Sequence, residues 1–364
     1  MSTQYQLRVY DRAGVIQYVI TDFLALSYTK EVNAPGVLTF DLNASNRAIS
    51  YFNLDWQVEV WRRNVDEGIA WYCDFYGFWR GEERIANSDG RSLYRALCVG
   101  QSGMLSRAVV AYPTNTTNRS YFSGVPAETI AKTLVQYNLT SSGTTADGRA
   151  RNVTKTGVTV PASGGTGTSM DLGCAWRNLL DVLRDVATVG GGDFDLVKTA
   201  AATWEFTWYA SQLGTDRSGS VVFALEYGNI TSPKLTRTYL NESTVGIVGG
   251  QGTDSERLVV VRQGTNYLAD YNDTEAFIDA RQLVSQLSLE QYGDAELWER
   301  RAFNDLSFDV LQVPQTLYGK HYFLGDLVTA RYEDVTATKK VQKVTVAMQA
   351  DGSERVKVEL TDRV

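Results

Sequence analysis

Histidine and cysteine are scarce in this sequence, and their scarcity excludes several kinds of chemistry. The 364 residues contain one histidine, His321, and three cysteines. A Ser-His-Asp hydrolase is excluded unless His321 is its base, and sites that need two or more histidines, as in many zinc enzymes, are excluded outright. Cys73, Cys98 and Cys174 are widely spaced and odd in number, so they predict neither a disulfide framework nor a metal site. We expect buried, reduced thiols, a reducing cytoplasm as the folding environment, and no cofactor.

Basic charge and long apolar runs are also limited. The chain has 35 Lys and Arg against 42 Asp and Glu, a formal net charge of −7, which disfavours a strongly basic nucleic-acid-binding protein. Most of the acidic excess lies in residues 251–364, which carry 13 basic and 19 acidic side chains. Such a surface keeps a protein soluble or repels another polyanion. No apolar run is long enough for a transmembrane helix, and Arg8, Asp11 and Arg12 interrupt the N-terminal stretch, so we expect neither membrane insertion nor a signal peptide.

The composition is that of a folded protein, with 43% hydrophobic and 21% charged residues, and the length predicts two to three domains. Residues 1–110 contain alternating apolar and polar stretches, for example at 5–10, 36–42 and 56–61, which predict strands of a small antiparallel barrel or sandwich. The stretch 70–79 is aromatic on both faces, which is typical of a strand between two layers or in a subunit interface. The candidate interface residues are Trp61, Phe75, Phe78 and Trp79.

Residues 111–235 have a different character and predict a lateral α/β region. Pro126 begins a predicted helix, and a second helix is expected over residues 175–189, ended by three glycines. Between them, residues 141–169 are rich in Gly, Ser and Thr and predict a loop. Strands are expected at 193–197, 203–209 and 220–225.

Residues 236–364 return to strands, with inserted helices. Strands at 244–248 and 257–262 flank a glycine-rich turn. One helix is expected to start at an Asp273 cap and a second to cover 295–306. The end is all strand, with a hairpin turn at 350–353. Similar stretches, Leu54–Val60 and Leu324–Ala330, precede hairpins in the first and last thirds. The predicted fold class is therefore β-rich α+β, with two related antiparallel barrels (1–110 and 236–364) and a peripheral α/β region (111–235).

No motif in the chain carries strong catalytic information. The glycine-rich run 164–169 lacks the lysine of a phosphate-binding loop, and the run 249–252 lies between strands, where a hairpin with positive φ is the better interpretation. His321 is expected to pack or to form hydrogen bonds. Two carboxylates could serve a glycosidase, but no spacing selects a pair, so solvated surface charge is the better interpretation. The carboxylates considered are Asp74, Glu82, Glu83 and Asp89.

The order of these pieces resembles the tail-tip hub proteins of long-tailed bacteriophages, which are similar to the central baseplate hub of contractile-tailed phages. The stretch 28–42 is similar to that family's opening hairpin, 98–107 to its strand, glycine and Leu…Arg segment, and 185–196 to an element of its middle domain. The stretch 229–257 is similar to the start of its second barrel, and 322–328 looks like its pattern Phe-x-Leu-Gly-Asp-x-Val. The positions that match the family pattern are Gly100, Arg107, Gly250, Gly252, Arg257, Gly325 and Asp326.

The resemblance implies a structural virion protein rather than an enzyme. In such hubs three chains, each with two related barrels, form a pseudo-six-fold ring that continues the tail tube and stacks on six-fold tail rings. The implied partners are two further copies of the chain, a distal tail ring protein, a tape measure protein, and tail-tip or central fibre proteins. Genomic DNA would pass through without specific binding, and the acidic last third would suit that channel. Assembly would take place in the host cytoplasm, and the final location would be the phage tail tip.

The resemblance also implies what this chain lacks. Some related tail-tip proteins hold an iron–sulfur cluster by four cysteines, which three scattered cysteines make improbable. The chain stops at Val364, so a fused lysozyme, peptidase or fibre is not expected. Two other interpretations stay open. One is a β-rich carbohydrate-binding or glycoside-hydrolysing protein, favoured by eight Trp and 20 Tyr. The other is a distal tail ring protein with six copies.

Overall fold

The computed structural model describes residues 3–86, 92–111, 120–142, 157–348 and 352–362. In the first third, strands alternate with tight turns and two short 3-10 helices, η1 and η2. The predicted strands are present, and β6 is the longest of them because it continues beyond its aromatic stretch in the pairing with β7. The elements are β1 (Thr3–Tyr10), β2 (Ile16–Ile20), β3 (Ala25–Glu31), β4 (Val37–Asn43), η1 (Arg47–Tyr51), β5 (Gln57–Asn64), β6 (Ile69–Ala86), β7 (Ser92–Gly100) and η2 (Gln101–Arg107).

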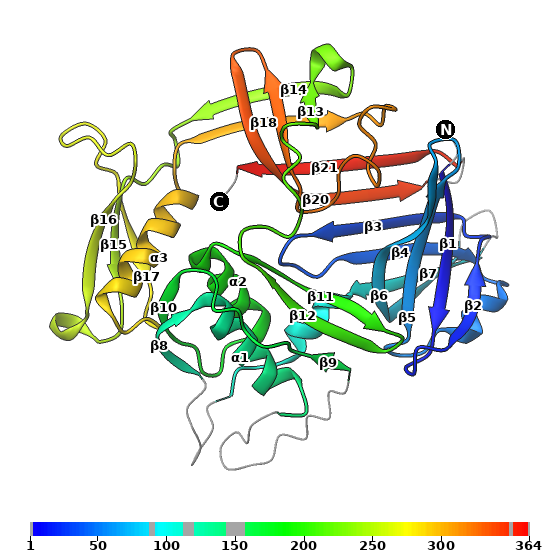
Figure 1. Cartoon of the computed structure of the whole chain (residues 1–364), viewed down its shortest axis with the longest axis horizontal. Helices are drawn as coiled ribbons and strands as arrows, with labels where there is room; N and C mark the ends of the chain where they lie inside the picture. Colours follow the sequence, from blue (N-terminus) through cyan, green and yellow to red (C-terminus); the bar gives the residue numbers. More distant parts are fainter. Residues whose placement is uncertain (1–2, 87–91, 112–119, 143–156, 349–351, 363–364) are drawn as a thin grey trace.

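The last third adds β19 (Leu327–Tyr332), β20 (Val335–Met348) and β21 (Glu354–Asp362). These strands and β13 (Val222–Ala224) join those of the first third in one 11-stranded sheet of order β13-β19-β20-β3-β4-β7-β6-β5-β1-β2, in which β21 also pairs with β20. The junction is the antiparallel pair β20–β3, with Thr345 opposite Thr29. Figure 1 shows β21, β20 and β3 side by side.

None of the sheets in the described residues closes into a barrel. The strands predicted at both ends of the chain are confirmed, and the protein is β-rich as expected, but the strand pairing does not confirm two barrels. Strand β20 pairs with β21 along one edge; along the other edge its first half pairs with β19 and its second half with β3. The strands of the two thirds therefore join in one sheet through β20.

The middle of the chain supplies two helices that pack on each other and on short sheets. The predicted helix after Pro126 is confirmed, and the second helix begins at Leu179, later than predicted, because the Asn178 side chain caps it by accepting a hydrogen bond from the Leu180 N–H. Gly191, with φ +68°, ends it as expected. The elements are β8 (Tyr121–Pro126), α1 (Ala127–Leu139), β9 (Val158–Thr159), β10 (Ser169–Gly173), α2 (Leu179–Gly190), β11 (Asp193–Ala200), β12 (Thr203–Tyr209), β13 (Val222–Ala224) and η3 (Leu225–Tyr227).

Between residues 230 and 310 the chain forms two further sheets that are not hydrogen-bonded to the main sheet. β14 (Ile230–Thr238) pairs with β18 (Phe303–Val310) in a two-stranded ribbon. A three-stranded sheet, covered on one face by α3 (Gln286–Glu299), stands at one end of the molecule's long axis (Figure 1). Its strands and the nearby 3-10 helix are β15 (Val245–Gly249), η4 (Asp254–Glu256), β16 (Val259–Gln263) and β17 (Glu275–Asp279).

Both helix predictions in this segment were wrong: the first region is a strand, and the second helix covers other residues. The helix expected from Asp273 is strand β17, in which exposed Phe277 alternates with buried Ile278 and the backbone pairs with β15. The helix expected over 295–306 starts earlier, at a Ser285 cap whose hydroxyl accepts a hydrogen bond from the Ser288 N–H, and it ends at Glu299. Strand pairing outweighed the helical spacing of apolar residues here.

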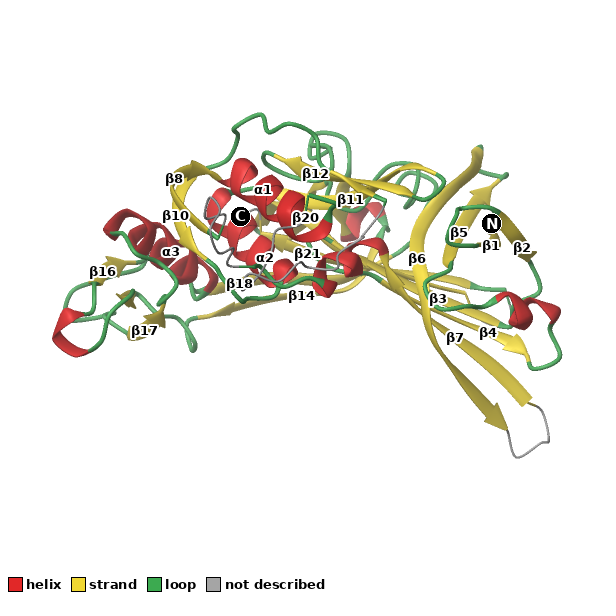
Figure 2. Ribbon diagram, turned by 90° about the horizontal axis from the view of Figure 1, so that it is seen from below, coloured by secondary structure: helices red, strands yellow, loops and turns green. Residues whose placement is uncertain are grey.

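Strand β6 lies between two hydrophobic cores. Phe75 packs in the core that the main sheet builds with Tyr318 and Tyr322, whereas Phe78 packs in the core that contains α1 and α2. This confirms a strand between two layers. The far part of the β6–β7 hairpin projects beyond the body of the molecule (Figure 2). Among the helices of the described residues, none is long and apolar enough to cross a membrane.

Candidate functional site

A buried carboxylate, Asp74 on β6, lies at the centre of a polar network that connects the first and last thirds. Its side chain is 1% exposed and forms an ion pair with Lys30 of β3, with 2.9 Å between Oδ1 and Nζ. Tyr28 donates its hydroxyl to Oδ2 at 2.6 Å, and Tyr318 donates its hydroxyl to Oδ1 at 2.8 Å. Burial opposes ionisation of Asp74, but the charges of Lys30 and Arg62 and these hydrogen bonds outweigh it and hold its pKa below the usual range.

Arg62 on β5 extends the network to the C-terminal strand. Its Nη2 atom lies 2.7 Å from Oε1 of Glu354 on β21, and its side chain is 5% exposed. Arg62 also donates through Nη1 to the Tyr318 carbonyl at 3.3 Å and to the Tyr72 hydroxyl at 3.2 Å. Tyr5 donates its hydroxyl to the same Glu354 oxygen. The Arg62 charge of the first third is thus neutralised by Glu354 of the last third, and Asp74, which pairs with Lys30 within the first third, is linked to the last third by the Tyr318 hydrogen bond.

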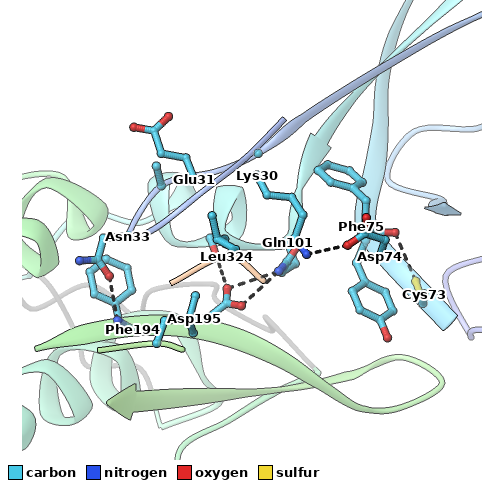
Figure 3. A pocket seen from close by; sticks show the side chains of 15 residues that line it. Lys30, Glu31, Asn33, Cys73, Asp74, Phe75, Gln101, Phe194, Asp195 and Leu324 are labelled. Carbon is cyan, nitrogen blue, oxygen red and sulfur yellow. Dashed lines mark hydrogen bonds and ion pairs between the residues drawn. The ribbon is translucent and has the colours of Figure 1, made fainter. Parts of the chain in front are cut away.

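A cavity of about 150 Å³ lies beside Asp74 (Figure 3). Asp195 of β11 stands in its wall, where it accepts a hydrogen bond from the Ser102 hydroxyl at 2.7 Å and weaker bonds from the Gln101 amide at 3.3 and 3.4 Å. Desolvation raises the pKa of Asp195 despite these donors. A volume of this size holds roughly five water molecules and is below the roughly 300 Å³ at which most small-molecule sites begin.

The residues around this cavity do not form a catalytic constellation. Burial raises the pKa of the Cys73 thiol well above its usual value, so the nucleophilic thiolate is suppressed. Cys73, Cys98 and Cys174 are free, as expected. No group of three or more His, Cys, Asp or Glu side chains suited to a metal ion occurs within the described ranges.

The carboxylates considered for a glycosidase are separated by their positions on β6. Asp74 is buried and forms an ion pair with Lys30. Glu82 and Glu83 are adjacent and exposed on the strand, where Glu82 pairs with Arg84 at 3.0 Å and Glu83 lies 3.6 Å from Arg95. Asp89 lies outside the described residues. The structure therefore brings no two of the described carboxylates together as a facing pair.

The His321 side chain accepts a hydrogen bond from the backbone. Its Nδ1 atom accepts a hydrogen bond from the Leu317 N–H at 2.9 Å, which confirms the hydrogen-bonding interpretation. Burial and the neighbouring Lys320 lower its pKa, so the neutral ring that accepts this bond is favoured.

Gly100 and Arg107, at the two ends of η2, make close contacts. A side chain at Gly100 would lie 2.8 Å from the backbone nitrogen of Gly36, and the Gly100 N–H donates to the Gly36 carbonyl at 2.7 Å. The Arg107 guanidinium donates to Asp55 at 2.8 Å. Both residues position η2 against the sheet.

The glycine-rich turn after β15 is held by Arg257. Arg257 donates to the Gly249 carbonyl at 2.9 Å, to the Gly250 carbonyl at 3.1 Å and to Asp279 at 2.7 Å. Gly252 has φ +110°, which agrees with the prediction of a turn that needs positive φ.

Gly325 and Asp326 connect the last third to the middle of the chain. Gly325 has φ +84°, and a side chain there would lie 2.7 Å from the Gly214 backbone nitrogen. Asp326 is 2% exposed and accepts hydrogen bonds from the Thr215 N–H at 2.7 Å, from Arg217 at 2.7 Å and from the Phe323 N–H at 2.8 Å. These two residues thus fix the 214–217 segment against β19.

The four candidate interface residues fall into two groups. Phe75 and Phe78 are 2% and 7% exposed and pack inside this chain. Trp61 is half-buried under the Arg8 guanidinium, which lies 3.7 Å from the ring centroid, and Trp79 is half-buried and stacks on Phe52. An interface role for the four stays a prediction.

The family model described as "Siphovirus ReqiPepy6 Gp37-like protein" matches residues 6–360. The chain belongs to this family. Its members are phage tail proteins, which confirms the resemblance found in the sequence motifs. A search of curated proteins finds no match.

Solved phage tail proteins share the fold along almost the whole chain. The 43 kDa tail protein of prophage MuSo2 from Shewanella oneidensis has a TM-score of 0.64 and 10% identity, and the match covers 99% of this chain and 98% of that one. The tail protein from Neisseria meningitidis MC58 has a TM-score of 0.59 and 12% identity, and the match covers 98% of this chain and 96% of that one. Prophage tail protein gp18 from Listeria monocytogenes EGD-e has a TM-score of 0.57 and 9% identity, and the match covers 98% of this chain and 95% of that one.

The sequence motifs did not reveal the buried polar network. Arg62 follows Val58 and Val60 in the strand alternation, which places its charge on the buried face and was a usable signal. The partners, Tyr318 and Glu354, are more than 250 residues away, so no local pattern could identify them.

Proposed function

We propose that three copies of this chain form the tail-tip or baseplate hub of a long-tailed phage, as a ring that continues the tail tube around the DNA channel. Family membership supports a structural tail role, and no catalytic role is proposed. In this proposal residues 1–110 and 236–364 are the two tube-forming parts, and residues 111–235 are peripheral. The proposed neighbours are a distal tail ring protein, a tape measure protein, and tip or fibre proteins.

The observation that carries the proposal is the direct β20–β3 pairing. A pseudo-six-fold ring built from three chains needs the two β-rich thirds of each chain at one fixed relative position. The shared sheet and the Arg62–Glu354 ion pair provide such a fixed relation, because moving the thirds apart would leave the buried Arg62 charge unpaired and remove the Tyr318 hydrogen bond from Asp74.

The proposal includes passage of DNA without retention. The acidic excess of the last third would repel phosphates if it faces the channel. We expect no retention of duplex DNA by the assembled ring at low salt, where electrostatic binding is strongest. Tight binding under that condition would contradict this part of the proposal.

Native mass spectrometry of the assembled protein, combined with imaging of the virion tail, tests the proposal. Three chains in a ring at the tail tip are expected. Six chains would favour a distal tail ring instead. A monomer that binds glycans, and loses binding on Trp→Ala substitution, would favour the carbohydrate-binding alternative.

A further inference from the structure

The loop Leu268–Asp273, between β16 and β17, presents large apolar side chains to solvent. Tyr271 is 91% exposed and Leu268 is 61% exposed. Asp270 and Asp273 are exposed beside them. Two neighbouring exposed apolar side chains on one loop form a candidate contact patch, and the charged residues beside them would lie at its polar rim.

The base of the 268–273 loop is held rigidly although its tip is exposed. Glu242, 6% exposed, accepts hydrogen bonds from the Asn266 amide at 2.6 Å and the Asn272 amide at 3.0 Å, on the two sides of the tip. The Ala302 N–H donates to the same carboxylate at 3.1 Å. Asp270 adopts φ +66°, a left-handed conformation that costs energy outside glycine. A loop fixed in one conformation loses little entropy when it binds.

A groove lies near η1, and we call it the η1 groove. It comprises two adjoining hollows of about 270 and 590 Å³ that share Ile49 and Arg84. Apolar side chains form much of its lining, and Tyr18 stacks on Tyr51 with ring centroids 5.1 Å apart. Its charged lining residues are the exposed arginines Arg47 and Arg84, of which Arg84 also pairs with Glu82 at 3.0 Å. The other principal lining residues are Ile85 and Leu93.

The loop and the groove cannot meet within one chain. β16 and β17 stand at one end of the long axis, and β2, which carries Tyr18 of the groove, stands at the other (Figure 1). A contact between unlike surfaces at opposite ends generates a closed ring when the rotation between copies closes.

We propose that the 268–273 loop of one copy docks in the η1 groove of the next copy. Tyr271 and Leu268 enter the apolar part of the groove, and Asp270 and Asp273 lie against Arg47 and Arg84. The opposite charges and the apolar tip select a second copy as the occupant. This contact rests on the proposed ring and names the surfaces that form it.

Substitutions at the tip test the contact by native mass spectrometry and sedimentation over a concentration series. Tyr271→Ala combined with Leu268→Ala is expected to raise the concentration for half-assembly about tenfold or more. Tyr227→Ala is the matched control, because Tyr227 is also exposed (56%) and lies on η3, outside both surfaces, so assembly should be unchanged. Circular dichroism and thermal unfolding establish that each variant is folded.

Charge reversal provides the sharper test. Asp270→Lys with Asp273→Lys is expected to block assembly, and so is Arg47→Glu with Arg84→Glu. All four substitutions in one chain should restore it, because each repulsive pair becomes attractive again. Folded loop variants that assemble as the wild type does, or a four-fold variant that is not rescued, would overturn the contact and leave the ring proposal standing. A wild-type chain that remains single at all concentrations would overturn the ring and the contact together.

Discussion

The two walls of the central cavity hold buried carboxylates in opposite electrostatic settings. Asp74 faces a cation, Lys30, and two tyrosine hydroxyls, and its pKa is lowered. Asp195, on the wall formed by the middle of the chain, accepts hydrogen bonds from Ser102, Gln101 and the Leu196 N–H, while Lys30 forms its ion pair with Asp74 instead, and burial raises the pKa of Asp195. These neutral donors and the more distant lysine charge do not offset the loss of solvation, whereas the direct ion pair of Asp74 does.

Both walls also belong to contacts that contain buried ion pairs. The contact between the first and last thirds includes the Arg62–Glu354 pair, so opening it is costly. The contact between the first third and β11 includes the pair of Lys198 on β11 with Glu59 on β5. The two walls therefore differ in the setting of Asp74 and Asp195, and each contact is held by an ion pair of its own.

Asp74→Asn is expected to have the largest effect. It keeps the shape but leaves Lys30 unpaired beside buried tyrosines, and we expect a loss of about 3 kcal/mol or more in the free energy of unfolding. Urea denaturation at pH 7 measures it. Asp294→Asn is the control, because Asp294 also pairs with a basic side chain, Arg262, at 2.7 Å but is half exposed. That control should lower the free energy of unfolding by less than about 1 kcal/mol. Comparable losses in both variants would show that burial of the Asp74–Lys30 pair does not increase its contribution to stability.

Tyr318→Phe is expected to have a smaller effect of about 2 kcal/mol, because it removes one hydrogen bond to a charged acceptor. Tyr322→Phe provides the comparison, since Tyr322 is equally buried but its hydroxyl accepts from the neutral Gln312 amide at 3.0 Å. The latter should cost about 1 kcal/mol. If the two variants lose the same stability in denaturant titrations, the charge on Asp74 contributes nothing to its bond with Tyr318.

Much of the strand content could be predicted from the sequence, because the alternation in β1, β4 and β5 reflects one buried face. Strand β6 was also predictable as a two-faced strand, since its aromatic residues have no polar alternation. Segment 275–279 was mistaken for helix because its spacing of Phe277 and Ile278 suits both structures. Only the pairing with β15, which is a tertiary feature, determines that this segment is a strand.

The pairing of β20 with β3 and the site around Asp74 were beyond sequence reasoning for the same reason. The register that sets Thr345 opposite Thr29 joins residues more than 300 positions apart. Asp74 was selected as a carboxylate of interest, but its lysine partner lies on another strand, and strand order is not encoded in local patterns. The family-pattern positions were identified from the resemblance. Gly252 and Gly325 have the positive φ of tight turns, whereas Gly100 is constrained by the approach of Gly36 and Asp326 by hydrogen bonds to the distant Thr215 and Arg217.

Asp195→Asn is expected to have the smallest effect and the opposite sign. Since folding raises the pKa of Asp195, its contribution to stability is fully present below the unfolded pKa and is lost as the pH rises through the folded pKa. Asparagine stays neutral, so the variant should be slightly more stable than the wild type at pH 8, and this gain should vanish near pH 4. For Asp74, whose pKa is lowered, stability is present above the unfolded pKa and is lost as the pH falls through the folded pKa. Thermal unfolding from pH 8 to pH 4 measures how the stability of the Asp195 and Asp74 variants, relative to the wild type, depends on pH. An Asp195→Asn variant that is less stable than the wild type at pH 8 would show that the fold favours the ionised form of Asp195, so that the two walls do not differ.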